Sequence, residues 1–152
     1  MKILFVCLGN ICRSPLAEAI FLHKAKAKGF SDKFLAASSG TANYHVGDPP
    51  DPRTIRNAGK NGVGITHVGR QLSEDDLIDF DLILAMDSSN LNNILKLKNA
   101  SRHLQKIKLI RDYDPQGKGN VPDPYYGVEQ DFQEVFEILD RSIENLIKNL
   151  KA

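Results

Sequence analysis

The sequence predicts an α/β fold with a single domain, built on a four-stranded parallel sheet that carries helices on both faces. Four short apolar runs alternate with longer stretches of helical periodicity, and this alternation is typical of parallel sheets. The first run, Ile3–Val6, is apolar without alternation, as expected of a strand covered on both faces. A chain of 152 residues corresponds to one domain, so we expect residues 1–152 to fold as one unit.

Local signals place the elements in order. Pro15 suits the first turn of the helix after the first strand, and Gly29 ends that helix. Asp51 and Pro52 are typical of a helix N-cap and first turn. The predicted strands are residues 2–7, 34–38, a run within 79–87, and 107–110. The predicted helices are residues 16–28, 52–62, a short one from 73, 88–98 and 128–150. In the helix 88–98, we expect Leu91, Ile94 and Leu95 to form the inner face.

The stretch Cys7–Ser14, which joins the first strand to the first helix, has the composition of an anion-binding loop. A helix start points free N–H groups and the positive end of its dipole outward. Successive N–H groups in a tight curl also form a nest for an oxyanion. Gly9 and Asn10 are the residue types most able to adopt the positive φ that such a curl needs. We expect the loop around one phosphate-sized group to consist of Leu8, Gly9, Asn10, Ile11 and Cys12.

Cys7 and Arg13, at the two ends of this loop, suit attack on a phosphate monoester through a phosphocysteine intermediate. Helix N-termini and nearby cations lower a cysteine pKa from about 8.5 to roughly 3.5–7.5. We therefore expect Cys7 to be largely thiolate, with the Ser14 hydroxyl donating to its sulfur. Arg13 can give two parallel N–H bonds to phosphate oxygens. The ordinary alternative is a strand-end cysteine beside a surface arginine, but here the strand, the loop and the helix start fall in register.

A second catalytic group is expected on the long irregular loop from Arg111 to Tyr126. A positioned acid that protonates the leaving oxygen accelerates such a reaction by about 10²–10⁴-fold. The loop offers Asp112, Asp114 and Asp123. Asp123 is favoured because Pro124 stiffens the backbone directly after it, although an Asp-Pro pair alone is more often an ordinary turn.

The stretch Val6–Pro15 resembles the C-x5-R-[ST] signature of the low-molecular-weight protein tyrosine phosphatases. The resemblance extends over most of the chain. Further matching segments are Ser38–Thr41, Tyr44–Gly47 with Asp51–Arg53, His67–Gln71, Asp81–Asp87 and the D-P-[YF] element that starts at Asp123.

The resemblance implies a role for each matching residue. It implies that Cys7 is the nucleophile and that Arg13 binds the phosphate. It implies that Asp123 protonates the leaving group and then acts as base for water.

By the same resemblance, the remaining matched residues support the loop or wall the cleft. Asn10 and Ser14 hold the loop in shape, and Ser38 and His67 bond to both of them. The cleft walls over the substrate ring are Leu8, Tyr44, Tyr125 and Tyr126, with Tyr44 standing where many relatives have tryptophan. Cys12 matches a cysteine that can form a reversible disulfide with Cys7 under oxidation.

Composition excludes several other classes. A formal net charge of +1 gives no argument for nucleic acid or membrane surfaces. Two cysteines make no disulfide framework, and no histidines stand at metal-ligand spacing around them, so we expect neither a metal nor a cofactor. The start of the sequence lacks the apolar core of a signal peptide. We therefore expect a cytoplasmic enzyme with phosphotyrosine protein substrates, monomeric or weakly self-associating.

Three alternatives remain on the same fold. Arsenate reduction needs a relay of further cysteines, which this chain lacks. Protein-arginine phosphatases have threonine where this chain has Ile11, so isoleucine favours tyrosine. A silent phosphate-binding module would not need Cys7, Arg13 and Asp123 together.

Overall fold

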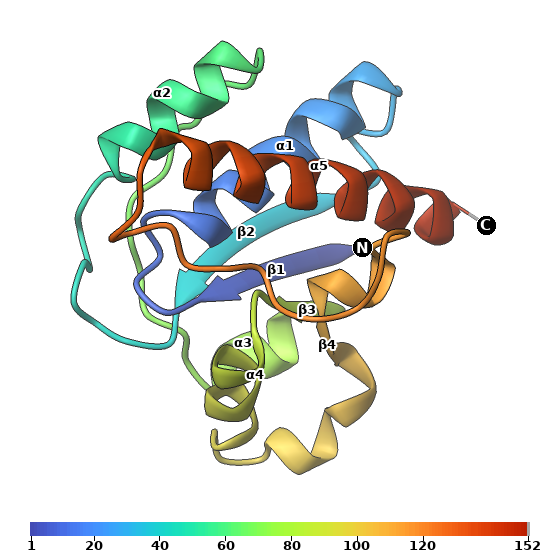
Figure 1. Cartoon of the computed structure of the whole chain (residues 1–152). Helices are drawn as coiled ribbons and strands as arrows, with labels where there is room; N and C mark the ends of the chain where they lie inside the picture. Colours follow the sequence, from blue (N-terminus) through green and yellow to red (C-terminus); the bar gives the residue numbers. More distant parts are fainter. Residues whose placement is uncertain (152) are drawn as a thin grey trace.

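The structure, a computed structural model, describes residues 1–151 and contains one parallel sheet. Figure 1 shows the sheet at the centre of the molecule, between two layers of helices. Its strands are β1 (Lys2–Cys7), β2 (Leu35–Gly40), β3 (Leu82–Ala85) and β4 (Ile107–Leu109), in the order β2-β1-β3-β4. The predicted fold class is confirmed.

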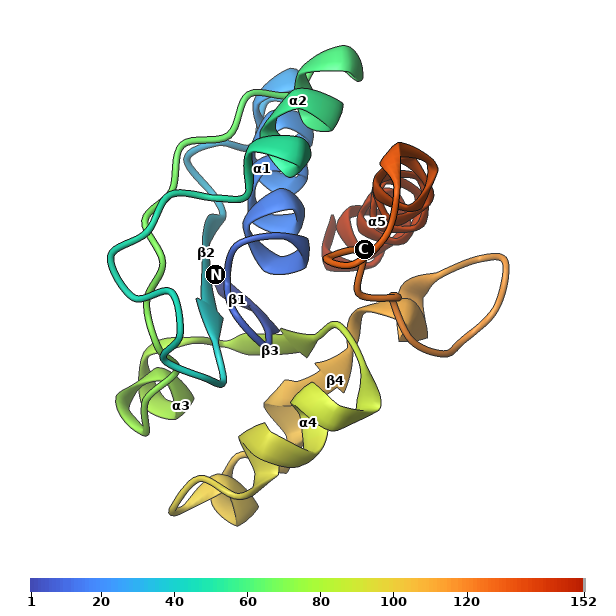
Figure 2. The same ribbon diagram turned by 60° about the vertical axis from the view of Figure 1, so that its left-hand side comes forward.

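The helices divide between the two faces of the sheet. On one face lie α1 (Arg13–Ala27), α2 (Pro52–Lys60) and α5 (Glu129–Lys151); on the other lie α3 (Asp75–Asp79) and α4 (Ser88–Leu95) (Figure 2). No helix within residues 1–151 is both long enough and apolar enough to cross a membrane.

Alternate side chains of the central strands pack into two separate hydrophobic cores, one on each face of the sheet. Ile3 and Phe5 of β1 pack with the apolar stripe of α5, where Leu139 is fully buried. Leu4 and Val6 point to the opposite face and pack with Ile94 of α4. Because β1 is buried on both faces, it is apolar without alternation, as the sequence predicted.

Several local expectations were wrong. The helix α1 begins at Arg13, before the apolar run that starts at residue 16, although Pro15 does lie in its first turn as expected; Ile110 lies in a 3₁₀ turn (Ile110–Tyr113) after β4. Two more 3₁₀ turns, Ala100–Arg102 and Leu104–Lys106, occupy a stretch where no element was predicted. Leu95 is 41% exposed because the buried stripe of the short helix α4 runs through Asn90 and Ile94, one turn apart.

The topology places a ligand site at the carboxyl end of β1. The chain goes from β1 through α1 to β2 on one side, and later returns to add β3 on the other side of β1. Ligands in open parallel sheets bind at such a switch in strand order, beyond the carboxyl ends of the strands. Cys7 is the last residue of β1 and therefore stands at this point.

Candidate active site

The loop of residues 8–12 leaves β1 at Cys7 and enters α1 at Arg13, and both of these end residues are only 3% exposed. Backbone bonds fix it from behind: Thr41 donates to the Cys7 carbonyl (2.9 Å), and Ala42 to that of Leu8 (3.0 Å). Gly40 permits this approach, because a Cβ there would lie 2.7 Å from the Leu8 carbonyl oxygen. The close packing of β2 therefore sets the shape of the loop.

Asn10 makes the turn inside the loop, with a φ of 58° in the left-handed region. Its side-chain amide donates to Ser14 Oγ (2.8 Å) and Ser38 Oγ (3.1 Å). Its Oδ1 accepts from His67 Nε2 (2.7 Å) and the Arg70 amide (3.0 Å). Gly9, expected to share the positive φ, does not have one; a Cβ there would instead lie 3.2 Å from His45 Cδ2.

The predicted support by Ser38 and His67 takes a slightly different form. Both residues contact Asn10, but within residues 1–151 neither bonds to Ser14. Glu18 of α1 completes the group: its Oε1 accepts from Ser38 Oγ (2.7 Å) and lies 3.4 Å from His67 Nδ1. Because the Ser38 hydroxyl donates its hydrogen bond to the Glu18 carboxylate, the Ser38 oxygen is left to accept from the Asn10 amide.

The Cys7 sulfur is surrounded by donors. Ser14 Oγ lies 3.0 Å from Sγ, and the Asn10 amide donates to Sγ at 3.3 Å. Ser14 Oγ already accepts from Asn10, and the Ser39 carbonyl lies farther away at 3.4 Å than the sulfur does at 3.0 Å, so we assign the Ser14 hydroxyl proton to the sulfur. In the described chain, the amides of Gly9, Ile11 and Cys12 donate to no protein acceptor. These groups provide the unused donors expected at a helix start.

The second loop cysteine has a different environment. Burial raises the pKa of Cys12 to about 12; the negative charges of Asp51 and Cys7 add to the rise, and the nearby Thr54 side chain opposes it. Cys12 is therefore a neutral thiol at physiological pH, and both cysteines are free.

Arg13 is fixed on one side and open on the other. Its Nη1 donates to Asp87 Oδ2 (2.6 Å) and to the Val121 carbonyl (3.0 Å). Burial would lower the pKa of Arg13, but the charges of Cys7 and Asp87 and the hydrogen bond to Asp87 outweigh it, so its pKa is raised. Within residues 1–151, Nε and Nη2 have no hydrogen-bond acceptor, which leaves the N–H groups of two guanidinium nitrogens for an anion.

The three candidate acids of the long loop occupy different environments. Both Asp114 oxygens accept from Arg141 and one also accepts from Arg111, so this carboxylate is buried and fully bonded. Asp112 is exposed and faces the backbone amide of Leu109. Only Asp123 lines the pocket that contains Cys7; its carboxylate lies 3.7 Å from Arg13 Nη2.

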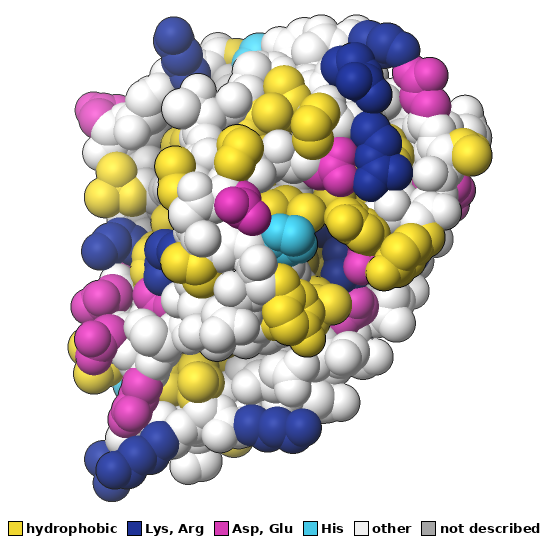
Figure 3. Space-filling view, turned by 90° about the vertical axis from the view of Figure 1, so that its left-hand side faces the viewer, with side chains coloured by type: hydrophobic (Ala, Val, Ile, Leu, Met, Phe, Trp, Pro, Cys, Tyr) yellow, Lys and Arg dark blue, Asp and Glu magenta, His cyan; other side chains and the backbone are white. Residues whose placement is uncertain are grey.

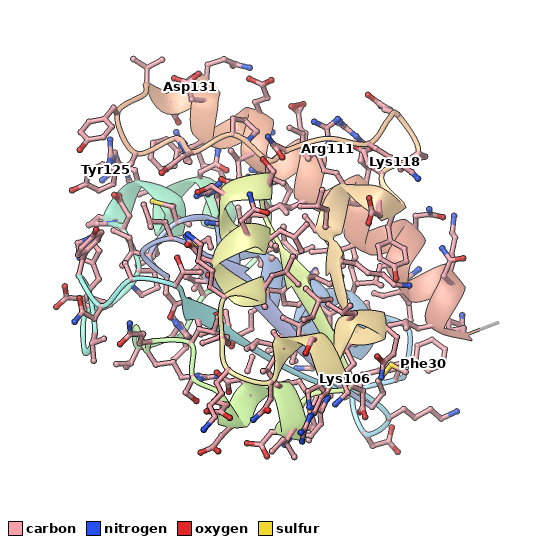
Figure 4. The ribbon with its side chains drawn as sticks, turned by 90° about the horizontal axis from the view of Figure 1, so that it is seen from below. Phe30, Lys106, Arg111, Lys118, Tyr125 and Asp131 are labelled. Carbon is pink, nitrogen blue, oxygen red and sulfur yellow. The ribbon has the colours of Figure 1, made fainter. Side chains whose placement is uncertain are left out.

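A pocket of about 300 Å³ joins these groups. Figure 3 looks onto this side of the molecule, where hydrophobic side chains surround a hollow. Figure 4 shows Tyr125 at the edge of the molecule, near the start of α5. The pocket is lined by Cys7, Leu8, Gly9, Ile11, Cys12, Arg13, Tyr44, His45, Asp123, Tyr125 and Tyr126. The four residues expected to wall the cleft are therefore brought together around Cys7.

The whole chain matches a known family. Residues 2–152 match the family model described as low molecular weight phosphotyrosine protein phosphatase. The chain belongs to this family. A rat low molecular weight phosphotyrosine protein phosphatase is 43% identical over 90% of this chain and 87% of its own.

Solved structures of the phosphatase family superpose on nearly all of the chain. A protein tyrosine phosphatase from Entamoeba histolytica, with Hepes in its active site, has a TM-score of 0.95 at 38% identity and covers 99% of this chain and 97% of its own. An arginine phosphatase from Drosophila has a TM-score of 0.89 at 31% identity, with coverage of 100% and 99%. The fold therefore accommodates two substrate types among the named neighbours.

Sequence reasoning missed three residues of the phosphatase site. Asp87 binds Arg13 while its other oxygen caps α4 at the Asn90 amide, Glu18 orients Ser38, and His45 lines the pocket. Asp87 and His45 lie inside segments that resemble the family's motifs, and this resemblance could have identified them as site residues. Glu18 gave none, because it reads as an ordinary helix residue.

Proposed function

We propose that this chain hydrolyses phosphotyrosine in proteins, and small aryl phosphates, through a phosphocysteine intermediate. The observation that carries the proposal is the convergence of Cys7, Arg13 and Asp123 on one pocket with aromatic walls. The unused loop amides and the two open donors of Arg13 can bind the phosphate oxygens.

In the first step, the Cys7 thiolate attacks phosphorus opposite the tyrosine oxygen. A sulfur–phosphorus bond forms as the phosphorus–oxygen bond breaks, and Asp123 gives its proton to the departing phenolic oxygen. Arg13 and the loop amides offset the charge that develops on the equatorial oxygens. The Ser14 hydroxyl, 3.0 Å from Sγ, supports the ionised sulfur before the attack.

In the second step, the Asp123 carboxylate removes a proton from a water that attacks the same phosphorus. The sulfur–phosphorus bond breaks, Cys7 leaves as thiolate, and inorganic phosphate is released. One carboxyl group thus serves as acid and then as base. With its side chain 45% exposed, Asp123 is accessible to both the leaving group and water.

The depth of the pocket favours phosphotyrosine. Cys7 and Arg13 lie at its base, each 3% exposed, whereas the walls Tyr44 and Tyr126 are 71% and 97% exposed. A phosphorylated phenol ring can span this depth, whereas the single methylene of phosphoserine is too short. Leu8, Tyr44 and Tyr125 offer apolar contact to an aromatic ring.

Side-by-side assays test the proposal. We expect a phosphotyrosine peptide and p-nitrophenyl phosphate to be hydrolysed, while matched phosphoserine and phosphoarginine peptides are cleaved far more slowly. Ile11 lines the pocket, so Ile11→Thr is the variant most suited to raise phosphoarginine cleavage. Faster cleavage of phosphoarginine than of phosphotyrosine by the unmodified chain would refute the proposed substrate.

We further propose that the enzyme is cytoplasmic, acts on phosphoproteins and is monomeric or only weakly self-associating. The deep cleft supports a phosphorylated side chain as substrate, and the net charge of +1 gives no general attraction to nucleic acid or membrane surfaces. Light scattering of the purified chain tests the monomer; a stable dimer at micromolar concentration would contradict it.

A further inference from the structure

A second cavity of about 170 Å³ adjoins the cleft and is lined by basic side chains. Arg53, Arg56 and Lys60 all line it and all come from α2. Their spacing of three and four residues places them along one face of the helix. Asn57, Phe132 and residues 127–129 form the rest of the lining.

Arg53 connects this basic cavity to the cleft. Its guanidinium donates to Asp51 and to the Tyr125 carbonyl (2.9 Å). It also lies 5.5 Å from the centre of the Tyr125 ring and 4.7 Å from that of Phe132. Since Tyr125 lines the cleft and Arg53 lines the basic cavity, only one stacked contact separates the two spaces.

Arg56 and Lys60 make fewer contacts with the rest of the protein than Arg53 does. Lys60 pairs with Glu129, and both of these side chains are more than 60% exposed. Arg56 is exposed and, within residues 1–151, has no carboxylate within 4.0 Å. The hydrogen bond and the charge of Lys60 lower the pKa of Glu129, against a small effect of burial, and the charge of Arg56 adds to the lowering. One carboxylate of the chain itself thus already lies in the field of both cations.

We propose that Arg56 and Lys60 form a subsite for an acidic residue of the phosphoprotein, a glutamate or aspartate close in sequence to the phosphotyrosine in the cleft. This inference rests on the proposed function. Along the helix axis, Arg56 and Lys60 lie about 4.5 and about 10.5 Å beyond Arg53. An extended peptide advances about 3.3–3.6 Å per residue, so about one to three residues cover these distances from Arg53, which itself contacts the cleft wall at Tyr125.

Peptide kinetics test the subsite. A phosphotyrosine peptide is prepared with one glutamate placed in turn at each of the three positions on either side, against a glutamine twin at each position. We expect kcat/KM to be about two- to five-fold higher for glutamate than for glutamine at the best position, as befits exposed ion pairs. The preference should disappear near 1 M salt, where the Debye length is about 3 Å.

Alanine variants test whether Arg56 and Lys60 cause the preference for the glutamate peptide. Arg56→Ala and Lys60→Ala should each reduce it, and the double variant should abolish it. Arg102→Ala and Lys108→Ala are matched controls, because both residues are exposed and neither lines the basic cavity; Arg102 lies in the turn Ala100–Arg102 and Lys108 in the edge strand β4. Hydrolysis of p-nitrophenyl phosphate should be unchanged in all of these variants, because this substrate has no flanking residue.

Removing the charge of Glu129 should change the preference for the acidic peptide in the opposite direction. Because its carboxylate competes for Lys60, Glu129→Gln should increase the preference for the acidic peptide. A preference that survives in the double variant, or that is absent at every position in the unmodified chain, would overturn the subsite. A chain that cleaves p-nitrophenyl phosphate without any such preference refutes only this inference, whereas a chain that cleaves neither substrate refutes the proposed function.

Discussion

The two loops that meet in the cleft are built in opposite ways. In the loop between β1 and α1, Cys7, Asn10, Arg13 and Ser14 are each 3% exposed or less, and their polar groups are joined by directed hydrogen bonds. In the late loop, the Asp123 side chain is 45% exposed, and its one hydrogen bond in the described chain comes from the Tyr125 amide.

This difference follows from what each loop has to do in the proposed reaction. The phosphate has the same shape in every substrate, so a rigid set of donors can be arranged for it in advance. The leaving group and the attacking water occupy the same place in turn, so the acid must remain accessible from the pocket. The buried, hydrogen-bonded part of the site therefore faces the constant part of the substrate, and the exposed part faces the groups that change.

The largest expected effect comes from removing the sulfur. Cys7→Ser should lower kcat for p-nitrophenyl phosphate by about 10⁴-fold or more, because a serine hydroxyl is not ionised in this environment. Steady-state kinetics measure the loss, and circular dichroism should show an unchanged fold. Substantial residual turnover would remove Cys7 from the mechanism.

The next largest effect is expected from removing the carboxyl group of Asp123 in the late loop. Asp123→Ala should lower kcat for a phosphotyrosine peptide by about 10²–10⁴-fold, because the leaving oxygen is no longer protonated. Inorganic phosphate should inhibit the variant about as well as the unmodified chain. Asp112→Ala is the control, since Asp112 is exposed and outside the pocket; a comparable loss there would place the acid elsewhere.

Asn10 tests the rigidity of the phosphate loop. Asn10→Ala removes four hydrogen bonds and should lower the free energy of unfolding by about 3 kcal/mol, with a loss of kcat of about ten-fold or more. Asn10→Gly loses the same bonds but accepts the φ of 58°, so we expect it to be about 1 kcal/mol more stable than the alanine variant. Urea unfolding measures both; equal stability of the two variants would show that the backbone conformation costs nothing.

The smallest effect concerns the anchor of the late loop at Asp114. Burial alone would raise its pKa, but hydrogen bonds from Arg141, Gln116 and Arg111 outweigh it, so the pKa of Asp114 is lowered. A carboxyl with a lowered native pKa stabilises the fold above its ordinary pKa of about 3.9 and loses this contribution as pH falls through the native value.

Asp114→Asn should therefore cost about 2 kcal/mol of unfolding free energy at pH 7, and the difference from the unmodified chain should shrink below about pH 4. Urea unfolding at a series of pH values measures it. A difference that stays constant down to pH 2 would show that the charge of Asp114 has no part in the anchor.

The predictable part of the molecule was the part encoded locally. The strand Lys2–Cys7, the cap of α2 by Asp51 and the long last helix, α5, follow from neighbouring residues, and the structure agrees with each of them. The convergence of Asp123 with Cys7 in one pocket was predicted through the family resemblance rather than from the residues alone.

The missed features depend on contacts between distant segments. Asp87 has the ordinary position of a helix cap, and only the tertiary fold brings Arg13, 74 residues earlier, to its second oxygen. Gly9 was expected to need a positive φ, but the fold requires it to be small because the loop around His45 packs against it. Leu95 has the right spacing for an inner face, yet the buried positions of the short helix α4 are Asn90 and Ile94, and Leu95 falls outside them.

The covalent intermediate on Cys7 provides the most direct test of the central claim. In Asp123→Ala, p-nitrophenyl phosphate should still phosphorylate the enzyme, because p-nitrophenolate departs without an acid, while hydrolysis of the intermediate should be slow without a base. Rapid quenching followed by peptide mass spectrometry should then find one phosphoryl group on the peptide that contains Cys7. A phosphoryl group on any other residue, or none during a measurable burst of p-nitrophenolate, would contradict the account.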